Sequence, residues 1–143
     1  MVTCDDKKLM ALALVVLREN ENEGATRSDL ARIVLEADLL HYEAWKRPLA
    51  GGKYDRALVG PVPQGLERVL EGAERGEILR LRRGEDGRER YHPGMHFPIK
   101  LAEAQEGLTS EERDALMAAL GFVRSLSPEE RGRRSRSFAA WRL

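Results

Sequence analysis

The side chains best suited to chemistry lie close together in the first third of the chain. Asp38, His41, Tyr42 and Trp45 follow one another within eight residues, and Pro48 comes shortly after them. Asp38 lies three residues before His41 and four before Tyr42, so each pair can share one face of a helix. A carboxylate that orients a histidine is an arrangement used in general acid–base catalysis.

A structural role explains the same residues. A proline-rich loop that follows a helix has backbone amides in need of partners, and Asp38 can accept a hydrogen bond from one of them while His41 packs. We favour this structural interpretation over the catalytic one, because no partner chemistry stands out elsewhere in the chain. The catalytic use of Asp38 and His41 is a distant third hypothesis.

Other familiar sites are not indicated by the sequence. It contains no glycine-rich phosphate loop, no HExxH motif and no paired CxxC motif. His92 and His96 have the spacing of two metal ligands on a helix, but a Pro-Gly pair lies between them, which favours loop histidines beside a hairpin. Cys4 is the only cysteine, so an intrachain disulfide is excluded, as suits a reducing cytosol. We expect neither a metal nor a cofactor.

The composition indicates a folded domain without a dominant charge. The chain has 143 residues, which is about the size of one domain and enough to bury a core. Lys and Arg number 24, as do Asp and Glu, so no net charge directs the protein toward nucleic acid or membrane. The longest apolar run, from Met10 to Leu17, is too short to cross a bilayer, and the basic region of a signal peptide is missing. We expect a cytoplasmic protein.

Apolar periodicity and capping residues predict a series of helices with one hairpin. The expected helices run from Asp5 to about Asn20, from Thr26 to about Lys46, from Pro63 to Gly76, from Lys100 to Glu106, from Thr109 to Val123 and onward from Ser127. The hairpin pairs Glu77–Arg83 with Arg88–His92. Leu49–Val59 is expected to be extended, with a short edge strand around Tyr54–Leu58. The predicted fold class is mainly α (α+β): residues 1–143 form a single compact helical domain with one small β-hairpin. A winged-helix-like arrangement of these elements is an alternative.

Two helix ends are marked strongly in the sequence. Pro48 lacks an amide hydrogen and disfavours helical geometry at Arg47, so the second helix must stop by about Lys46. Ser127 begins a Ser-Pro-Glu-Glu sequence that supplies an N-cap, a proline in the first turn and a closing glutamate. On the second helix, the apolar face is completed by either Leu40 or His41.

The arginines support a second hypothesis, a winged-helix DNA-binding regulator. Two adjacent helices, a later helix and an arginine-rich hairpin outline that fold, in which the hairpin contacts phosphate. The hairpin arginines are Arg80, Arg82, Arg83, Arg88 and Arg90, and a second basic cluster contains Arg131, Arg133, Arg134, Arg136 and Arg142. Acidic residues dilute both clusters, so a solvated surface is the favoured interpretation and DNA binding is the alternative.

Several short motifs follow one another along the chain. They are Leu-Glu-Ala-Asp-Leu-Leu-His with Asp38 and His41, the aromatic pair Tyr42 and Trp45, Arg-Pro-Leu-x-Gly with Pro48 and Gly51, Tyr54, Gly-Pro-Val-Pro with Gly60, Pro61 and Pro63, and a closing segment from Ser135 to Trp141. In this order they resemble the Panacea domain, the SocA-like antitoxin family. Its members typically read Leu-Tyr-Leu-Ala-Asp-x-x-His, Gly-Arg-Pro-Ile-Thr-Gly, Tyr-Gly-Pro-Val-Pro and Ser-His-x-x-x-Ala-Trp. Four positions depart from that pattern: Glu36, Ala50, Val59 and Arg136.

The resemblance implies a non-enzymatic antitoxin that neutralises a cognate toxin by direct protein–protein binding. Such proteins are encoded beside the toxin, often in mobile elements or prophages, and delivery of the toxin to a protease is a second mode. Because the family pairs with many toxin types, we expect Asp38, Gly60 and Pro61 to be scaffold. Tyr42 and Trp45 suit either core packing or an exposed binding surface. We place partner contacts on the hairpin and the last helix, at Arg80, Arg82, Arg88, Arg90, Arg133 and Arg134.

Overall fold

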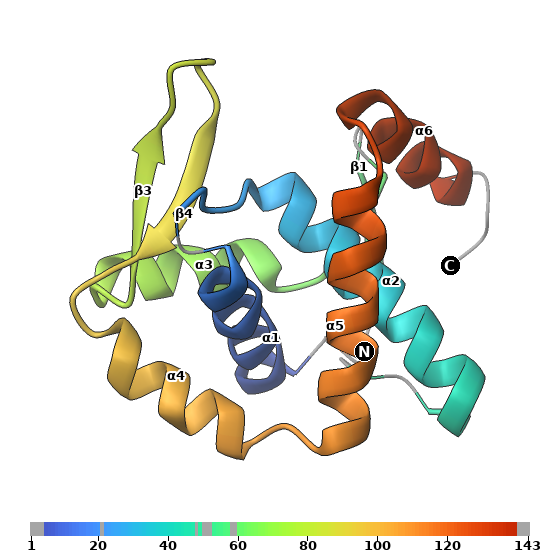
Figure 1. Cartoon of the computed structure of the whole chain (residues 1–143), viewed down its shortest axis with the longest axis horizontal. Coiled ribbons are helices and arrows are strands. Elements are labelled where there is room, and N and C mark those ends of the chain that lie inside the picture. Colours follow the sequence, from blue (N-terminus) through green and yellow to red (C-terminus); the bar gives the residue numbers. More distant parts are fainter. Residues whose placement is uncertain (1–4, 21, 48, 50–52, 58–59, 140–143) are drawn as a thin grey trace.

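The computed structural model describes residues 5–20, 22–47, 49, 53–57 and 60–139. This part of the chain forms six helices and two antiparallel hairpins (Figure 1), so the mainly helical class is confirmed. The helices are α1 (Asp6–Glu19), α2 (Arg27–Trp45), α3 (Leu66–Arg75), α4 (Phe97–Glu106), α5 (Ser110–Ser125) and α6 (Pro128–Ala139). One hairpin joins β1 (Tyr54–Ala57) to β2 (Gly60–Pro63), and the other joins β3 (Leu79–Arg83) to β4 (Glu89–Pro93).

Helix α1 lies at the centre of the hydrophobic core. Leu9 and every residue from Ala11 to Leu17 are buried, so almost the whole circumference of the helix is covered. It packs against α3 and α4, which flank it, and also contacts α2 and α5 (Figure 1). Helices α2 and α5 pack on each other along their apolar faces, and β2 lies against both α2 and α6. No helix within the described ranges is long and apolar enough to cross a membrane.

The helix ends that the sequence marks most strongly are confirmed. Helix α2 ends at Trp45, and Lys46 caps it in the left-handed region with φ 58°. The Ser127 hydroxyl accepts a hydrogen bond from the Glu130 amide, while the Glu130 carboxylate accepts one from the Ser127 amide. On α2 the apolar face is completed by His41, which is 3% exposed, and not by Leu40, which is 40% exposed.

The prediction of a single hairpin was wrong, because Pro61 and Pro63 belong to a strand. Pro63 pairs with Tyr54 in β2 and is not in the first turn of α3, which Gly65 caps. Proline has no amide hydrogen, so the hydrogen bonds that β2 donates to β1 must come from Gly60 and Val62. The backbone nitrogens of the two prolines therefore point away from β1, so no hydrogen bond between the two strands is lost at these positions.

Helix α4 begins three residues earlier than the sequence indicated. Its first residue is Phe97, and Pro98 lies within its first turn, where the missing amide hydrogen costs no helical hydrogen bond. The proline that was interpreted as a sign of irregular structure is therefore compatible with the helix start. Phe97 is buried and anchors this end of α4 in the core.

The turn between α1 and α2 is pinned to the second hairpin. Ala25 and Tyr91 form an antiparallel bridge, with N···O distances of 3.1 and 2.8 Å in the two directions. Gly24 has φ +72°, and a Cβ there would come within 2.6 Å of the Tyr91 carbonyl oxygen, so this turn requires glycine. Along the chain, the order is helix, bridge, helix, helix, hairpin, which is the order of a winged helix, with the β1–β2 hairpin inserted before α3.

Candidate functional site

Asp38 and His41 connect the end of α2 to the chain that follows it. Asp38 is 7% exposed; its Oδ1 accepts a hydrogen bond from the Leu49 amide at 2.9 Å, and its Oδ2 accepts one from the Tyr54 hydroxyl. His41 Nδ1 lies 2.8 Å from the Arg47 carbonyl oxygen. Because a carbonyl oxygen only accepts, this ring nitrogen carries the proton. Both side chains hold the segment after α2, as the structural interpretation of these residues predicts.

Gly60 marks the place where the first hairpin meets α6. Its φ is +118°, and a Cβ at this position would lie 2.6 Å from the Ser135 Cβ. Any larger residue would therefore combine backbone strain with a collision against α6. Pro61 and Pro63, the other motif residues of β2, are both buried. The close approach fixes the distance between the hairpin and the last helix.

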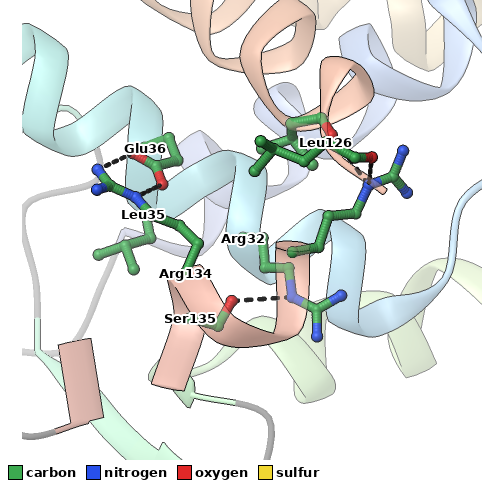
Figure 2. A pocket seen from close by; sticks show the side chains of 8 residues that line it. Arg32, Leu35, Glu36, Leu126, Arg134 and Ser135 are labelled. Carbon is green, nitrogen blue, oxygen red and sulfur yellow. Dashed lines mark hydrogen bonds and ion pairs between the residues drawn. The ribbon is translucent and has the colours of Figure 1, made fainter. Parts of the chain in front are cut away.

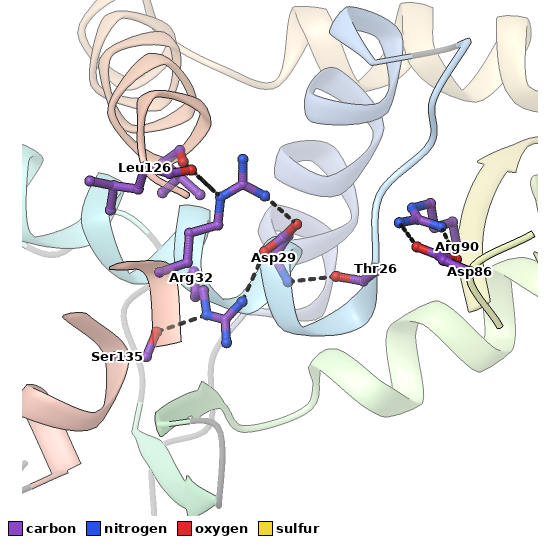
Figure 3. A network of polar contacts seen from close by, with 9 residues as sticks. Thr26, Asp29, Arg32, Asp86, Arg90, Leu126 and Ser135 are labelled. Carbon is purple, nitrogen blue, oxygen red and sulfur yellow. Dashed lines mark hydrogen bonds and ion pairs between the residues drawn. The ribbon is translucent and has the colours of Figure 1, made fainter. Parts of the chain in front are cut away.

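Ser135 begins a line of polar contacts that runs between α6 and the start of α2 (Figure 3). The Ser135 side chain is 3% exposed, and its Oγ accepts a hydrogen bond from Arg32 Nε at 2.9 Å. Arg32 Nη1 also donates to Asp29 Oδ1 at 3.0 Å, and Arg131 Nη1 donates to Asp29 Oδ2 at 2.9 Å. Arg131 Nε reaches the carbonyl oxygen of Leu126 at 3.1 Å. Asp29 is thus shared between two arginines from different helices.

Glu36 and Arg134 form a second link between α2 and α6 (Figure 2). Arg134 Nε and Nη2 donate to the two oxygens of Glu36, at 2.8 and 3.1 Å. The Glu36 side chain is 8% exposed, and the Arg134 guanidinium also lies 5.5 Å from the centre of the Phe122 ring. The hydrogen bond with Glu36 raises the pKa of Arg134. Glu36 departs from the family pattern, and Arg134 supplies the cation that its burial requires.

These contacts define a structural unit that we call the hairpin clamp, made of Asp38, Tyr54, Gly60, Ser135 and Arg32. It holds β1–β2 between α2 and α6. Asp38 accepts hydrogen bonds from the Leu49 amide and the Tyr54 hydroxyl, and Arg32 donates one to Ser135, so these groups fix the relative positions of three elements. Four residues of the sequence motif meet here, although they are distributed from position 38 to position 135.

The remaining motif residues separate into two groups. Tyr42 and Trp45 are 54% and 50% exposed, so they present aromatic surface and do not pack in the core. Pro48, Gly51 and Trp141 lie outside the described residues, as does Cys4. His92 is on β4 and His96 precedes α4, so the two histidines do not share a helix. Over the described ranges, no group of three or more His, Cys, Asp or Glu side chains could hold a metal ion.

The arginines that we expected to contact a partner lie on two separate sides of the molecule. Arg80, Arg82, Arg88 and Arg90 are on the β3–β4 hairpin, whereas Arg133 and Arg134 are on α6, at the other end of the longest axis (Figure 1). Arg90 pairs with Asp86 at 2.7 Å and holds the pKa of that carboxyl well below its usual range. Arg134 is engaged with Glu36. The two groups therefore cannot belong to one small contact surface.

Three residues of the polar link were missed as site residues by the sequence analysis. Arg131 was named only in a basic cluster interpreted as a solvated surface, and no site role was predicted for Asp29 or Arg32. The i, i+3 spacing of Asp29 and Arg32 is a usable signal for an ion pair on one helix face. The spacing carries no information about Arg131, which is 102 positions away from Asp29.

Comparison with known proteins yields no match. No family model matches the sequence, and neither do the curated proteins or the solved structures that were searched. The resemblance to the Panacea domain therefore rests on the motif residues alone.

Proposed function

We propose that this protein is an antitoxin that neutralises a cognate toxin by direct protein–protein binding. The resemblance to the Panacea domain motivates the proposal. The observation that carries it is the convergence of Asp38, Tyr54, Gly60 and Ser135 in the hairpin clamp. Residues that match one family pattern, spread over most of the chain, thus form a single packed unit. A family that pairs one domain with many toxins needs such a scaffold beneath a variable surface.

The exposed features of the molecule are of kinds that protein interfaces use. Tyr42 and Trp45 present rigid aromatic surface at the end of α2, and aromatic and arginine side chains are enriched among binding hot spots. Asp38 of the clamp and the neighbouring His41 fasten the following segment to this end of α2, so little conformational freedom is lost there on binding. Delivery of the bound toxin to a protease is compatible with the same surface.

The test begins with the reading frame next to this gene. Expression of the neighbouring protein alone should stop growth, and coexpression of the present chain should restore it. Gly60→Ala should impair rescue, because the clamp cannot close over a Cβ, while Gly121→Ala should rescue fully, since a Cβ at Gly121 meets no atom within 4 Å. Failure of the wild-type chain to rescue growth, together with the absence of a complex between the purified proteins, would refute the antitoxin proposal.

DNA binding is the alternative, and the chain order of a winged helix together with the arginines on β3–β4 favours it. The charges of α3 oppose it. This helix would face DNA in such a fold, and it exposes Glu67, Glu71 and Glu74 beside Arg68 and Arg75. Three carboxylates near phosphates would be repelled. Titration of the protein against its own promoter at two salt concentrations separates the cases, since binding without sequence preference that vanishes at physiological salt indicates a surface-charge effect only.

A further inference from the structure

A large groove lies beside α1, between α3 and α4. Its volume is about 770 Å³, which falls within the range of established binding sites. The apolar lining comes from α1, α3, α4 and the residue before β3: Met10 and Ile78 are partly exposed, and Ala11, Leu14, Val69 and Ala104 form the buried floor. Along α1 the groove extends from Asp5 to Leu14, which corresponds to about 14 Å of helix. None of these residues belongs to the hairpin clamp.

Gly72 opens one wall of the groove. It lies in the interior of α3, where glycine destabilises a helix relative to alanine. A Cβ at this position would meet no atom closer than Arg75 Nη2, at 3.9 Å, and its backbone does not have the positive φ that favours glycine. Packing within the chain therefore does not require glycine here. Because Gly72 has no side chain, none projects into the groove at this position.

The rim of the groove carries an excess of positive charge. Five cationic and three anionic side chains line it, although the whole chain has a formal net charge of zero. Asp6 is paired with Arg68 at 2.7 Å, Glu103 with Lys100 at 3.5 Å and Lys8 with Glu112 of α5 at 2.6 Å, and the Asp5 carboxylate caps α1. Lys7 and Arg75 have no ion pair with another residue of the described ranges. A complementary ligand therefore carries negative charge.

We propose that this groove binds an amphipathic helix of a partner protein, with an apolar face toward α1 and acidic residues beside Lys7 and Arg75. A trough about 14 Å long accommodates roughly two and a half turns of helix. Its apolar residues lie along α1 and between α3 and α4, with charged residues at its edges, an arrangement that matches the apolar and polar faces of an amphipathic helix. Naming the partner as the toxin rests on the antitoxin function proposed above.

The groove can be tested without the toxin. A synthetic helical peptide of about 14 residues, with leucine at i, i+3, i+4 and i+7 spacing and glutamate elsewhere, is titrated into the ¹⁵N-labelled full chain. We expect amide shifts at Met10, Leu14, Val69 and Ala104. Gly72→Leu should weaken binding at least about tenfold, whereas the matched control Gly121→Leu, on the exposed face of α5, should leave it unchanged. Shifts that avoid the groove, or equal affinity for the two variants, would overturn the proposal.

A charge reversal provides a second variant that does not fill the groove. Lys7→Glu combined with Arg75→Glu changes two exposed side chains. The double variant should bind the glutamate peptide about five- to tenfold more weakly than the wild type does. It should bind a peptide with lysine in place of glutamate more tightly, by about the same factor. Identical affinities of wild type and double variant for both peptides would contradict the predicted role of the rim.

Rescue of growth separates the groove from the antitoxin function. If the wild-type chain and Gly121→Leu rescue but Gly72→Leu does not, and all three fold, the toxin occupies the groove. Equal rescue by both variants would overturn the groove as the toxin site and leave the antitoxin function standing. Peptide binding in the groove, with neither rescue of growth nor a complex with the neighbouring protein, would support the groove and refute the antitoxin function.

Discussion

Helices α1 and α6 are both packed against α-helical and β-strand neighbours, but different forces hold them. Helix α1 buries apolar side chains on nearly every side, from Leu9 to Leu17. Helix α6 has the sequence PEERGRRSRSFA and is tied to α2 by Arg131, Arg134 and the buried Ser135. Apolar burial is non-directional and strong in sum, whereas ion pairs and hydrogen bonds depend on particular partners. One helix therefore supplies stability and the other supplies a defined position.

The comparison predicts that single substitutions act differently in the two regions. In the apolar region, the loss should scale with the volume that is removed. In the polar region, it should depend on whether a buried partner is left without its counterpart. The following experiments test that difference.

The largest effect is expected for truncation in α1. Leu12 is fully buried, so Leu12→Ala should lower the free energy of unfolding by about 2–5 kcal/mol through lost burial and a new cavity. Chemical denaturation measures it. Arg133→Ala, on an exposed face of α6, should stay within about 0.5 kcal/mol of the wild type and serves as the control. Similar losses for the two variants would refute the distinction between the regions.

The next largest effect is expected at the contact between the first hairpin and α6. Gly60→Ala should destabilise the protein by about 1–3 kcal/mol, because φ +118° and the nearby Ser135 Cβ both oppose a side chain. Gly121→Ala is matched in chemistry and should instead stabilise α5 by about 0.5–1 kcal/mol, since its surroundings are open. Thermal unfolding of both variants provides the measurement. A Gly60→Ala variant as stable as the wild type would show that the clamp can shift.

The Glu36–Arg134 pair sharpens the comparison because it can be made apolar. Arg134→Met should cost about 1–2 kcal/mol, a value reduced from that of a fully buried pair because the Arg134 side chain is 44% exposed. Glu36→Leu with Arg134→Met should return stability to within about 1 kcal/mol of the wild type. A double-mutant cycle by denaturation gives the coupling energy. If the destabilisation of the double variant equals the sum of those of the two single variants, the Glu36–Arg134 interaction does not account for the destabilisation of Arg134→Met.

The smallest effect is expected for the ion pair between Lys8 of α1 and Glu112 of α5. Burial would raise the pKa of Glu112, but the Lys8 ammonium and the Thr109 amide outweigh burial, and the pKa is lowered. A lowered pKa means that the stabilisation is present above the ordinary value of about 4.5 and is lost as pH falls through the folded-state pKa. Glu112→Gln should therefore be less stable at neutral pH, by less than about 1 kcal/mol, and should lose less stability on acidification.

A pH series of denaturation curves for the wild type and Glu112→Gln measures this difference. Lys8 Nζ lies 2.6 Å from Glu112 Oε2. If stability depends on pH in the same way in the two proteins, this ion pair does not contribute to the pH dependence of the free energy of unfolding. The pair joins α1 to α5, so the same result also reports how far the apolar helix depends on polar contacts.

The helices could be predicted from local patterns, because caps and apolar spacing act within a few residues. The Thr109–Glu112 capping box and the apolar face of α3 are examples. The β1–β2 hairpin was not predicted, because its prolines are unusual in strands and their position is permitted only by the register with β1. Strand pairing depends on the partner strand, which local propensity does not describe.

The candidate site was predictable only in part. The neighbourhood of Asp38 follows from the need of a buried carboxylate for nearby amides, and the Leu49 amide lies only 11 positions away. Glu36 and Arg134 are 98 positions apart, so nothing in one sequence pairs them. The contact at Gly60 likewise required the position of α6. The groove depends on three helices at once, and the sequence analysis gave no indication of it.

Gly60 and Ser135 are in contact in the folded protein, but they are synthesised at different times. Ser135 leaves the ribosome 75 residues after Gly60, which corresponds to about 4–15 s of translation. During that interval α1 and α2 are already available to form the apolar core, but the first hairpin has no α6 to cover it. The nascent chain therefore exposes one face of β2 until the arginine-rich helix arrives. Slow codons between these two positions would lengthen the period in which a chaperone or a protease can bind that face.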